Sequence, residues 1–239
     1  MSWLKLPRRP EPEVMGDADE VEAYASSAAQ AHLDAIDNTL VDHVLSLGIA
    51  GGRLLDIGTG PGGIPLKTVR RASGMRAIGV DYSRNMILAA QRAAANQGLA
   101  DRLTFLVGDA NRLPFPDASF DIVLSNSVLH HLVNPLALLN EMARVARSDG
   151  VVLLRDLRRP SRLAFPFHVL WHGRHYSGLM HKLFEDSVAA AYTGDELAEM
   201  LRRSALADAR VFFHKRAHLG FVRNGRRAAP GAGGKEGKA

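Results

Sequence analysis

Three aspartates each follow a short apolar run that has the composition of a buried strand: Asp56, Asp81 and Asp109. The first lies in Leu-Leu-Asp-Ile-Gly-Thr-Gly-Pro-Gly-Gly, residues 54–63, where the apolar run breaks into a glycine-rich loop. Glycine has no Cβ and adopts positive φ, so a flat or extended ligand can lie against such a loop. In an open parallel sheet, ligands bind at the carboxyl ends of the strands. The three carboxylates are therefore candidates for one binding site.

The glycine spacing alone does not identify the ligand. Residues 58–63 satisfy G-x-G-x-x-G, the dinucleotide pattern, but a pyrophosphate would meet the carboxylate of Asp56 in a like-charge contact. S-adenosylmethionine carries an ammonium and a sulfonium at its methionine end, which suit an acid. Asp81 can accept hydrogen bonds from both ribose hydroxyls, and Asp109 with its neighbouring amides can hold the adenine ring. Together the acids favour S-adenosylmethionine, although each one alone could cap a turn or a helix.

The chain around these acids alternates between strand-like and helix-like segments from Arg53 onward. Ser83 is a suitable N-cap for one helix, and Gly98 is a suitable stop at its end. The pattern predicts strands over 53–57, 76–81, 103–108, 120–125, 151–156, 209–215 and 219–223, and helices over 64–72, 84–97 and 135–147. A further helix, with Thr193 as its N-cap, is predicted to run through Ser204. Such alternation indicates βαβ units and a parallel sheet with helices on both faces.

The flanking segments are less regular. Residues 17–47 have helical spacing with a break near 31–34, and residues 1–33 are predicted to form an N-terminal segment with a cover helix around Tyr24. The main domain is predicted over 34–221. Within it, residues 157–192 show no clean period, and we predict an irregular lid over the acceptor. Residues 222–239 read as a disordered basic tail.

Composition limits the possible chemistry. With 239 residues and 46% apolar content, the chain can build one full-sized core. It has no cysteine, which excludes disulfides, thiolate metal sites and thiol nucleophiles, and fits a cytoplasmic protein. We predict no metal site and no transmembrane segment, since no stretch of sufficient length is uninterruptedly apolar. Most of the net charge of +5 lies in the tail, where five basic residues accompany one acid.

Three segments carry a family resemblance: Leu-Leu-Asp-Ile-Gly-Thr-Gly-Pro-Gly, Gly-Val-Asp-Tyr-Ser-Arg-Asn-Met and Gly-Asp-Ala-Asn-Arg-Leu-Pro-Phe-Pro-Asp-Ala-Ser-Phe-Asp. They resemble the ordered motifs of class I S-adenosylmethionine-dependent methyltransferases, most of all the small-molecule enzymes of the ubiquinone/menaquinone-biosynthesis type. The resemblance spans roughly 51–156. It implies a Rossmann-like, doubly wound α/β fold with a seven-stranded, mostly parallel sheet whose last strand is antiparallel. It implies cofactor contacts at Asp56, Gly58, Thr59, Gly60, Gly62, Asp81, Tyr82, Met86, Gly108, Asp109, Ala110 and Asn126.

Methyl transfer from a sulfonium is an in-line displacement, so the enzyme mainly aligns the reactants and excludes water. No dedicated nucleophile is needed, and a base is needed only where the acceptor must lose a proton. His130 is the first candidate base, with His175 and Tyr176 in the insert as further candidates. His130 and His131 are adjacent, so we expect at most one to point into the site. A packing role at a helix start is the alternative for this pair.

The insert bears on the acceptor. Its arginines and neighbouring aromatic residues suit a planar or acidic molecule, or equally a lid whose arginines face solvent. These residues are Arg155, Arg158, Arg159, Arg162 and Arg174, with Phe165, Phe167, Trp171 and Tyr176. Residues 163–171 are apolar enough for a peripheral contact with a membrane interface.

We predict transfer to a small-molecule acceptor. The segment after the fourth predicted strand lacks Asn-Pro-Pro-Tyr, and without cysteine the covalent mechanism for pyrimidine C5 is impossible, so nucleic-acid substrates are disfavoured. Three alternatives remain open. One is an RNA or protein methyltransferase that uses the basic tail, and another is a regulator that binds S-adenosylmethionine without catalysis. The third is an enzyme that uses the bound cofactor for chemistry other than methyl transfer.

Overall fold

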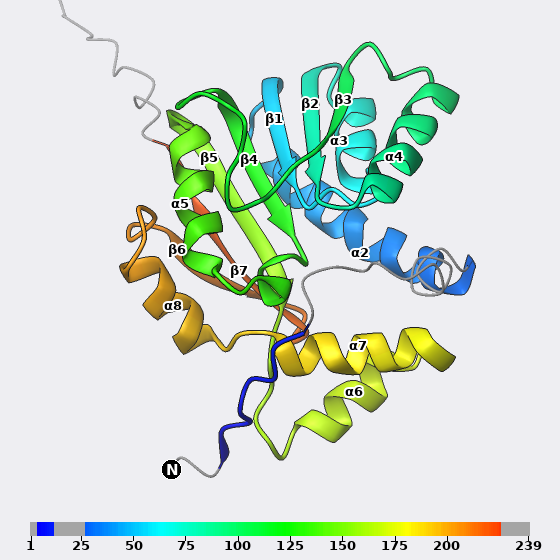
Figure 1. The fold of residues 1–239 in the computed structure, drawn as a ribbon, viewed down its shortest axis with the longest axis vertical. Helices are drawn as coiled ribbons and strands as arrows, with labels where there is room; N and C mark the ends of the chain where they lie inside the picture. The colour runs from blue at the N-terminus through cyan, green and yellow to red at the C-terminus, as the bar shows by residue number, and fades with distance from the viewer. Residues whose placement is uncertain (1–3, 12–26, 226–239) are drawn as a thin grey trace, which may run out of the picture.

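A seven-stranded sheet organises the part of the chain that the structure describes, residues 4–11 and 27–225 of a computed structural model (Figure 1). The strands are β1 Gly51–Ile57, β2 Gly74–Asp81, β3 Leu103–Val107, β4 Phe120–Asn126, β5 Ala146–Leu157, β6 Arg210–His214 and β7 His218–Arg223. Their spatial order is β3-β2-β1-β4-β5-β7-β6. The first five strands pair in parallel, and β7 runs antiparallel between β5 and β6. The predicted fold class is confirmed.

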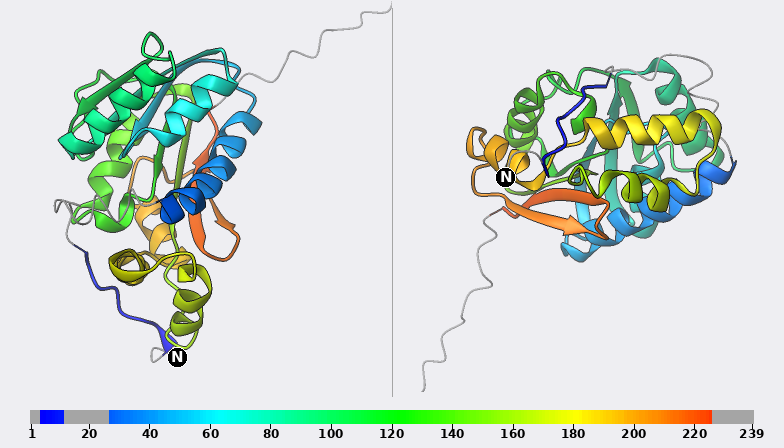
Figure 2. Two further views of the ribbon diagram at one scale, coloured as in Figure 1. Left: turned by 90° about the vertical axis from the view of Figure 1, so that its right-hand side faces the viewer. Right: turned by 90° about the horizontal axis from the view of Figure 1, so that it is seen from below.

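Helices cover both faces of this sheet. The bounds are α2 Ser27–Ser46, α3 Gly63–Arg71, α4 Arg84–Asn96, η2 (a 3-10 turn) Leu129–His131, α5 Pro135–Val145, α6 Phe165–Gly173, α7 Gly178–Ala190 and α8 Gly194–Arg202. Helices α2, α3 and α4 pack on one face, and α5 and α8 on the other. Helices α6 and α7 lie apart from both layers, across the carboxyl ends of the strands (Figures 1 and 2).

The strands supply side chains to two separate cores because successive residues of a strand point to opposite faces. Leu54 joins the core beneath α2, α3 and α4, whereas Leu55 joins the core beneath α5 and α8. Ile122 and Val123 in β4 divide in the same way. Both faces of the central strands are therefore buried. Only the strand ends and the loops that follow them are left to contact a ligand.

The predicted helix ends agree with the structure where a capping residue next to the helix sets the end. Ser83 accepts a hydrogen bond from the Met86 amide at 3.5 Å, and Thr193 forms a capping box with Glu196. Gly98 has φ +65° just after α4. These three predictions are confirmed.

Other boundaries were wrong. The break near 31–34 does not occur, because α2 runs through it without interruption. The helix predicted over 135–147 ends at Val145, since the extended Ala146 pairs with Phe120 across β4 and β5. By contrast, strand β7 includes Val222 and Arg223, which pair with β5, in agreement with the predicted strand over 219–223.

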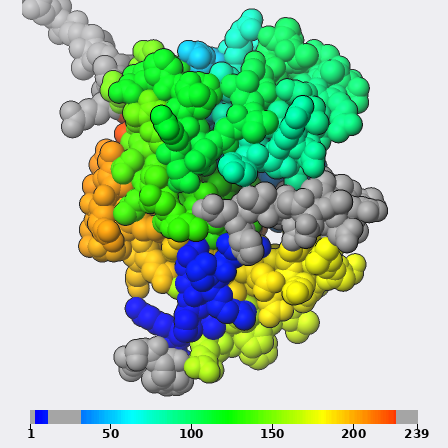
Figure 3. Space-filling view, viewed as in Figure 1, coloured from blue at the N-terminus to red at the C-terminus, as the bar shows by residue number. Residues whose placement is uncertain are grey.

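The insert 157–192 is helical, not irregular, and consists mostly of α6 and α7. Residues 4–11 run along these helices at the surface (Figure 3). The Arg9 amide donates to the Ala189 carbonyl at 3.1 Å, and the Arg162 amide donates to the Leu4 carbonyl at 2.9 Å. The predicted cover around Tyr24 and the tail beyond residue 225 lie outside the described residues. No helix within the described ranges is both long and apolar enough to cross a membrane.

Candidate cofactor and acceptor site

A cavity of about 650 Å³ lies at the carboxyl ends of the central strands. Its walls come from four strand-end loops, 57–60, 80–83, 108–111 and 126–128, and from residues of α2, α6 and α7. One cavity therefore joins the glycine-rich loop, two of the predicted acids and the inner face of the insert. Most of the predicted cofactor residues line it: Gly58, Thr59, Gly60, Asp81, Tyr82, Met86, Gly108, Asp109, Ala110 and Asn126.

The glycine-rich loop is held against β2. The amides of Gly58 and Thr59 both donate to the Val80 carbonyl, at 2.8 and 3.0 Å. Gly58 has φ +71°, and a Cβ at this position would lie only 2.0 Å from Val128 Cγ2. Glycine is thus required both by backbone conformation and by the close approach of the segment after β4.

Asp81 connects this loop to the start of α4. Its Oδ2 accepts a hydrogen bond from the Gly60 amide at 2.8 Å, and its Oδ1 accepts one from the Ser83 amide at 2.9 Å. Burial raises the pKa of Asp81, although these backbone bonds oppose the rise. Asp109 lies in the same cavity and accepts from the Asn111 amide at 2.8 Å. Both acids line the cavity, and their contacts with ribose and adenine stay a prediction.

Asp56 does not line the cavity, and this differs from the sequence prediction. The residue is 1% exposed, and its Oδ2 accepts a hydrogen bond from Thr59 Oγ1 at 2.7 Å. Burial raises its pKa to about 7, against the lowering effect of that bond. Asp56 therefore supports the loop through Thr59, and its contact with a ligand ammonium stays a prediction. Gly62 does not line the cavity either. Its missing Cβ makes room for the side chains of Phe105 and Ala90.

A carboxylate that the sequence analysis missed does line the cavity. Asp37 of α2 faces the glycine-rich loop, since a Cβ at Gly63 would lie 2.9 Å from Asp37 Oδ2. Burial raises its pKa to about 6, while Lys67 and Arg155 lower it. Asp37 belongs to no sequence motif. It lies in a helix that precedes the first strand, and it comes close to the glycine-rich loop only in the folded chain.

The four arginines of the insert, together with Arg155 of β5, do not form the predicted acceptor pocket, because none of the five lines the cavity. Arg155 is buried and donates to Asn126 Oδ1 at 2.9 Å and to Thr39 Oγ1 at 2.8 Å, which fixes a cavity residue. Arg159 pairs with Glu196 at 2.6 Å, and Arg174 stacks on the Trp171 ring. Arg155 and Arg159 are therefore held by contacts with the surrounding protein, whereas Arg174 is exposed at the surface.

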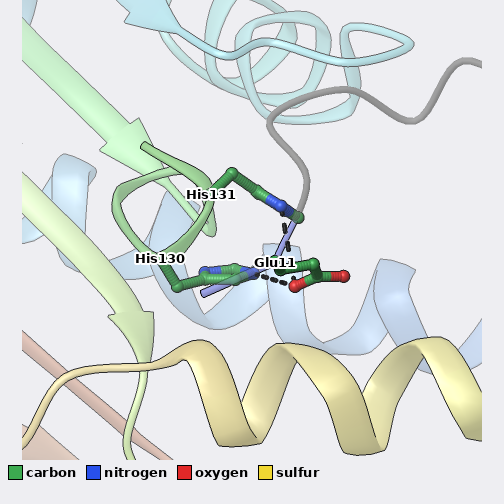
Figure 4. A group of neighbouring side chains, drawn as sticks. All are labelled: Glu11, His130 and His131. Carbon is green, nitrogen blue, oxygen red and sulfur yellow. Dashed lines mark ion pairs between the residues drawn. The ribbon is translucent and has the colours of Figure 1, made fainter. Parts of the chain in front are cut away.

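Both adjacent histidines line the cavity, contrary to the expectation that at most one would (Figure 4). Their rings lie 4.0 Å apart, tilted by 37°, and both approach Glu11 of the N-terminal segment. His130 Nδ1 lies 2.5 Å from Asp156 Oδ1, and the His130 amide donates to Asp156 Oδ2 at 3.1 Å. Burial favours neutral His130, but the charge and hydrogen bond of Asp156 outweigh it and raise its pKa. A catalytic role for His130 stays a prediction.

The other two candidate bases differ from each other. Tyr176 lines the cavity, but burial raises its pKa to about 12, so it holds its proton at neutral pH. His175 does not line the cavity and stacks on His32, with ring centroids 4.2 Å apart. A catalytic role for either residue stays a prediction.

The sheet is doubly wound with an antiparallel β7, and aspartates and glycines line the cavity at its strand ends. This combination is typical of the fold of nucleoside-binding enzymes. A family model described as "Methyltransferase domain" matches residues 55–154. The chain is 32% identical over 167 residues to a demethylmenaquinone methyltransferase of Roseiflexus castenholzii, covering 66% of this chain and 68% of the relative. This chain belongs to the S-adenosylmethionine-dependent methyltransferases.

Two further likenesses agree with that assignment. A 27-O-demethylrifamycin SV methyltransferase of Amycolatopsis mediterranei is 37% identical over 107 residues, which is 45% of this chain and 39% of the relative. A crystal structure of a SAM-dependent methyltransferase from Aquifex aeolicus has a TM-score of 0.61 at 20% identity, covering 86% of this chain and 97% of that one. The latter shows the fold. The predicted family and cofactor, S-adenosylmethionine, are confirmed.

Proposed function

We propose that this enzyme transfers the methyl group of S-adenosylmethionine to a small molecule held between the strand ends and α7. The observation that carries the proposal is the single cavity, which continues from the cofactor loops to the inner face of the insert. Similar enzymes are named for small acceptors, demethylmenaquinone and 27-O-demethylrifamycin SV. A cavity of about 650 Å³ is within the usual range for small-molecule sites.

The cofactor part of the cavity suits each portion of S-adenosylmethionine. We propose that Asp81, which lines the cavity, accepts hydrogen bonds from the ribose, and that Asp109 accepts one from the adenine amine. Asp37 is the carboxylate that faces the glycine-rich loop, so we assign the methionine ammonium to Asp37 in place of Asp56. Binding in this orientation directs the methionine end toward α2 and leaves the space near the histidines for the acceptor.

The insert contributes a mostly apolar and aromatic lining to the acceptor space. Tyr176, Met180, Leu183 and Phe184 of the insert face the cavity, and none of the insert arginines does. Such a surface suits a flat, mostly apolar body and excludes water from the sulfonium. We therefore propose an aromatic or similarly flat acceptor. A densely acidic acceptor has no matching cation among the insert arginines.

We also propose that α6 contacts an anionic lipid surface. Phe167, Leu170 and Trp171 are 74%, 71% and 63% exposed, and Leu163 lies at the same helical spacing just before them. Exposed apolar side chains on one face of a helix favour the boundary of a membrane. Arg162 and Arg174, both exposed, flank this surface and match the charge of anionic headgroups.

Vesicle flotation tests this contact. Wild-type protein should float with vesicles that contain phosphatidylserine, less so with neutral phosphatidylcholine vesicles. The double variant Phe167→Ser, Trp171→Ser should stay in the lower fraction, whereas Leu88→Ser, an exposed leucine on α4, should float as wild type does. Wild-type protein that never floats would refute the lipid contact. If wild-type protein self-associates and the double variant does not, the surface contacts a second copy of this chain instead of a lipid surface.

A methyl-transfer assay tests the function itself. Protein incubated with S-adenosylmethionine labelled in the methyl group should label members of a panel of phenols, quinols and hydroxylated polyketides, but not RNA or added protein. Label in RNA or protein alone would favour the alternative based on the tail. S-adenosylhomocysteine binding without label in any acceptor would favour the regulator. A cytoplasmic location remains a prediction from the cysteine-free composition.

A further inference from the structure

Three potential metal ligands meet beside the acceptor space. Glu11 comes from the N-terminal segment, and His130 and His131 come from η2 (Figure 4). Glu11 Oε2 lies 3.9 Å from His130 Nε2 and 3.7 Å from His131 Nδ1. These separations are too long for hydrogen bonds. Two ligands that bind one cation at about 2.0–2.2 Å lie roughly 3.0–3.5 Å apart, so a small contraction would complete a site.

The surrounding contacts hold the three groups in this orientation. Asp156 binds His130 Nδ1 at 2.5 Å and leaves Nε2 directed at Glu11. A carboxylate on the second ring nitrogen is the usual support for a metal-binding histidine. Ser187 Oγ donates to Glu11 Oε1 at 3.2 Å. The other oxygen, Glu11 Oε2, is buried and accepts no hydrogen bond within the described residues. The Glu11 side chain as a whole is 10% exposed.

The N-terminal segment that carries Glu11 is itself anchored. Arg8 Nη2 donates to the His130 carbonyl at 2.8 Å, and Arg8 Nε donates to the Ala190 carbonyl at 2.6 Å. The same cation stacks on the Tyr192 ring. Glu11 is therefore brought to the histidines by contacts that do not depend on its own charge. A buried oxygen that is anchored between two imidazoles and accepts no hydrogen bond within the described residues points to an occupant.

We propose that Glu11, His130 and His131 bind one divalent transition-metal cation of the Zn²⁺ class. Two imidazole nitrogens and one carboxylate oxygen suit Zn²⁺, Co²⁺ or Fe²⁺ and leave coordination positions open. Both histidines line the cavity, so the open positions face the acceptor space. The site gives His130 the role of a ligand in place of the predicted base.

The role of the cation in catalysis rests on the proposed methyl transfer. A hydroxyl bound to the cation has a lower pKa and releases its proton to water. The oxygen lone pair then forms the bond to the methyl carbon, while the electron pair of the C–S bond stays on sulfur. The products are the methyl ether and S-adenosylhomocysteine. The cation thus replaces a general base for a hydroxyl acceptor.

Metal titration of untagged, chelator-treated protein tests the site without turnover. Calorimetry with Zn²⁺ should show one site per chain, and Co²⁺ should give a visible absorption band. Glu11→Gln should weaken Zn²⁺ binding by more than about 100-fold, and Asp156→Asn by about 10–100-fold. Glu199→Gln, at an exposed ion pair on α8, should bind as wild type does. Circular dichroism and S-adenosylhomocysteine binding confirm that each variant is folded.

Wild-type protein without stoichiometric binding, or Glu11→Gln with wild-type affinity, would overturn the site. Methyl transfer to a hydroxyl acceptor should be at least about tenfold slower in the metal-free protein and in Glu11→Gln. Equal rates in metal-free and Zn²⁺-loaded protein would overturn the catalytic role. Intact Zn²⁺ binding with no transfer to any acceptor would instead contradict the proposed function and leave the site standing.

Discussion

Gly58 is the position where one added methyl group should most disturb the cofactor loop. Its φ is +71°, and a Cβ there would lie 2.0 Å from Val128 Cγ2. A left-handed conformation costs an alanine about 1–2 kcal/mol, and forcing a methyl group into a packed site costs about 1–3 kcal/mol. We expect Gly58→Ala to lower the free energy of unfolding by about 2–5 kcal/mol, the sum of the two costs.

The two costs can be separated with Val128→Ala, which removes the methyl group that the new Cβ would strike. In the double variant the clash is relieved, but the backbone penalty remains. The double variant should therefore be less destabilised than the sum of the single variants, by about 1–3 kcal/mol. Denaturant unfolding of the four proteins measures this difference. Independent sites add to within about 0.5 kcal/mol, so additivity would refute the proposed contact between Gly58 and Val128.

Three other predictions follow from the buried acids. Wild-type affinity for S-adenosylhomocysteine should fall as the pH drops through about 6, because protonated Asp37 no longer attracts the ammonium. Above about pH 6, Asp37→Asn should bind S-adenosylhomocysteine at least about tenfold more weakly than wild type, and calorimetry should show no fall in its affinity as the pH drops. The same dependence of affinity on pH in both proteins would contradict the contact between Asp37 and the ammonium. Thr59→Val should lower the free energy of unfolding by about 1–3 kcal/mol, because Asp56 Oδ2 loses its hydrogen-bond donor. Thermal and denaturant unfolding measure this change, and unchanged stability would contradict the contact between Thr59 and Asp56. Because the pKa of Asp56 is raised to about 7 on folding, the folded state binds this proton more tightly than the unfolded state. Wild type should therefore lose stability relative to Asp56→Asn as the pH rises from about 4 to 7, whereas parallel stability curves would exclude the raised pKa.

The strand-end acids were predictable because their signals are local. An apolar run followed by an acid and a turn is legible in sequence, and parallel strands bring such ends to one edge. Asp81 and Asp109 follow this rule and line the cavity. Asp56 has the same local signature, but Thr59 folds back to bind it, and the loop covers the carboxylate. Sequence order alone does not show which strand-end acid a following loop will bury.

The residues that were missed reach the site through tertiary contacts. Asp37 arrives on α2, and Glu11 arrives on an N-terminal segment held by Arg8 and α7. Neither lies in a motif, and each is far in sequence from the groups it faces. The insert was read as irregular for a different reason. Helix α6 directs large apolar residues such as Phe167 outward, so its hydrophobic pattern does not mark a core-facing helix.

Calorimetric titration with S-adenosylhomocysteine most directly tests the central claim that this cavity is the cofactor site. Wild-type protein should bind one molecule per chain. Asp81→Ala should weaken binding by at least about 10–100-fold, because hydrogen bonds to a carboxylate contribute about 1.5–3 kcal/mol each. Asp101→Ala, an exposed carboxylate before β3, serves as the matched control and should bind as wild type does. Equal affinity of wild type and a folded Asp81→Ala variant would contradict the account.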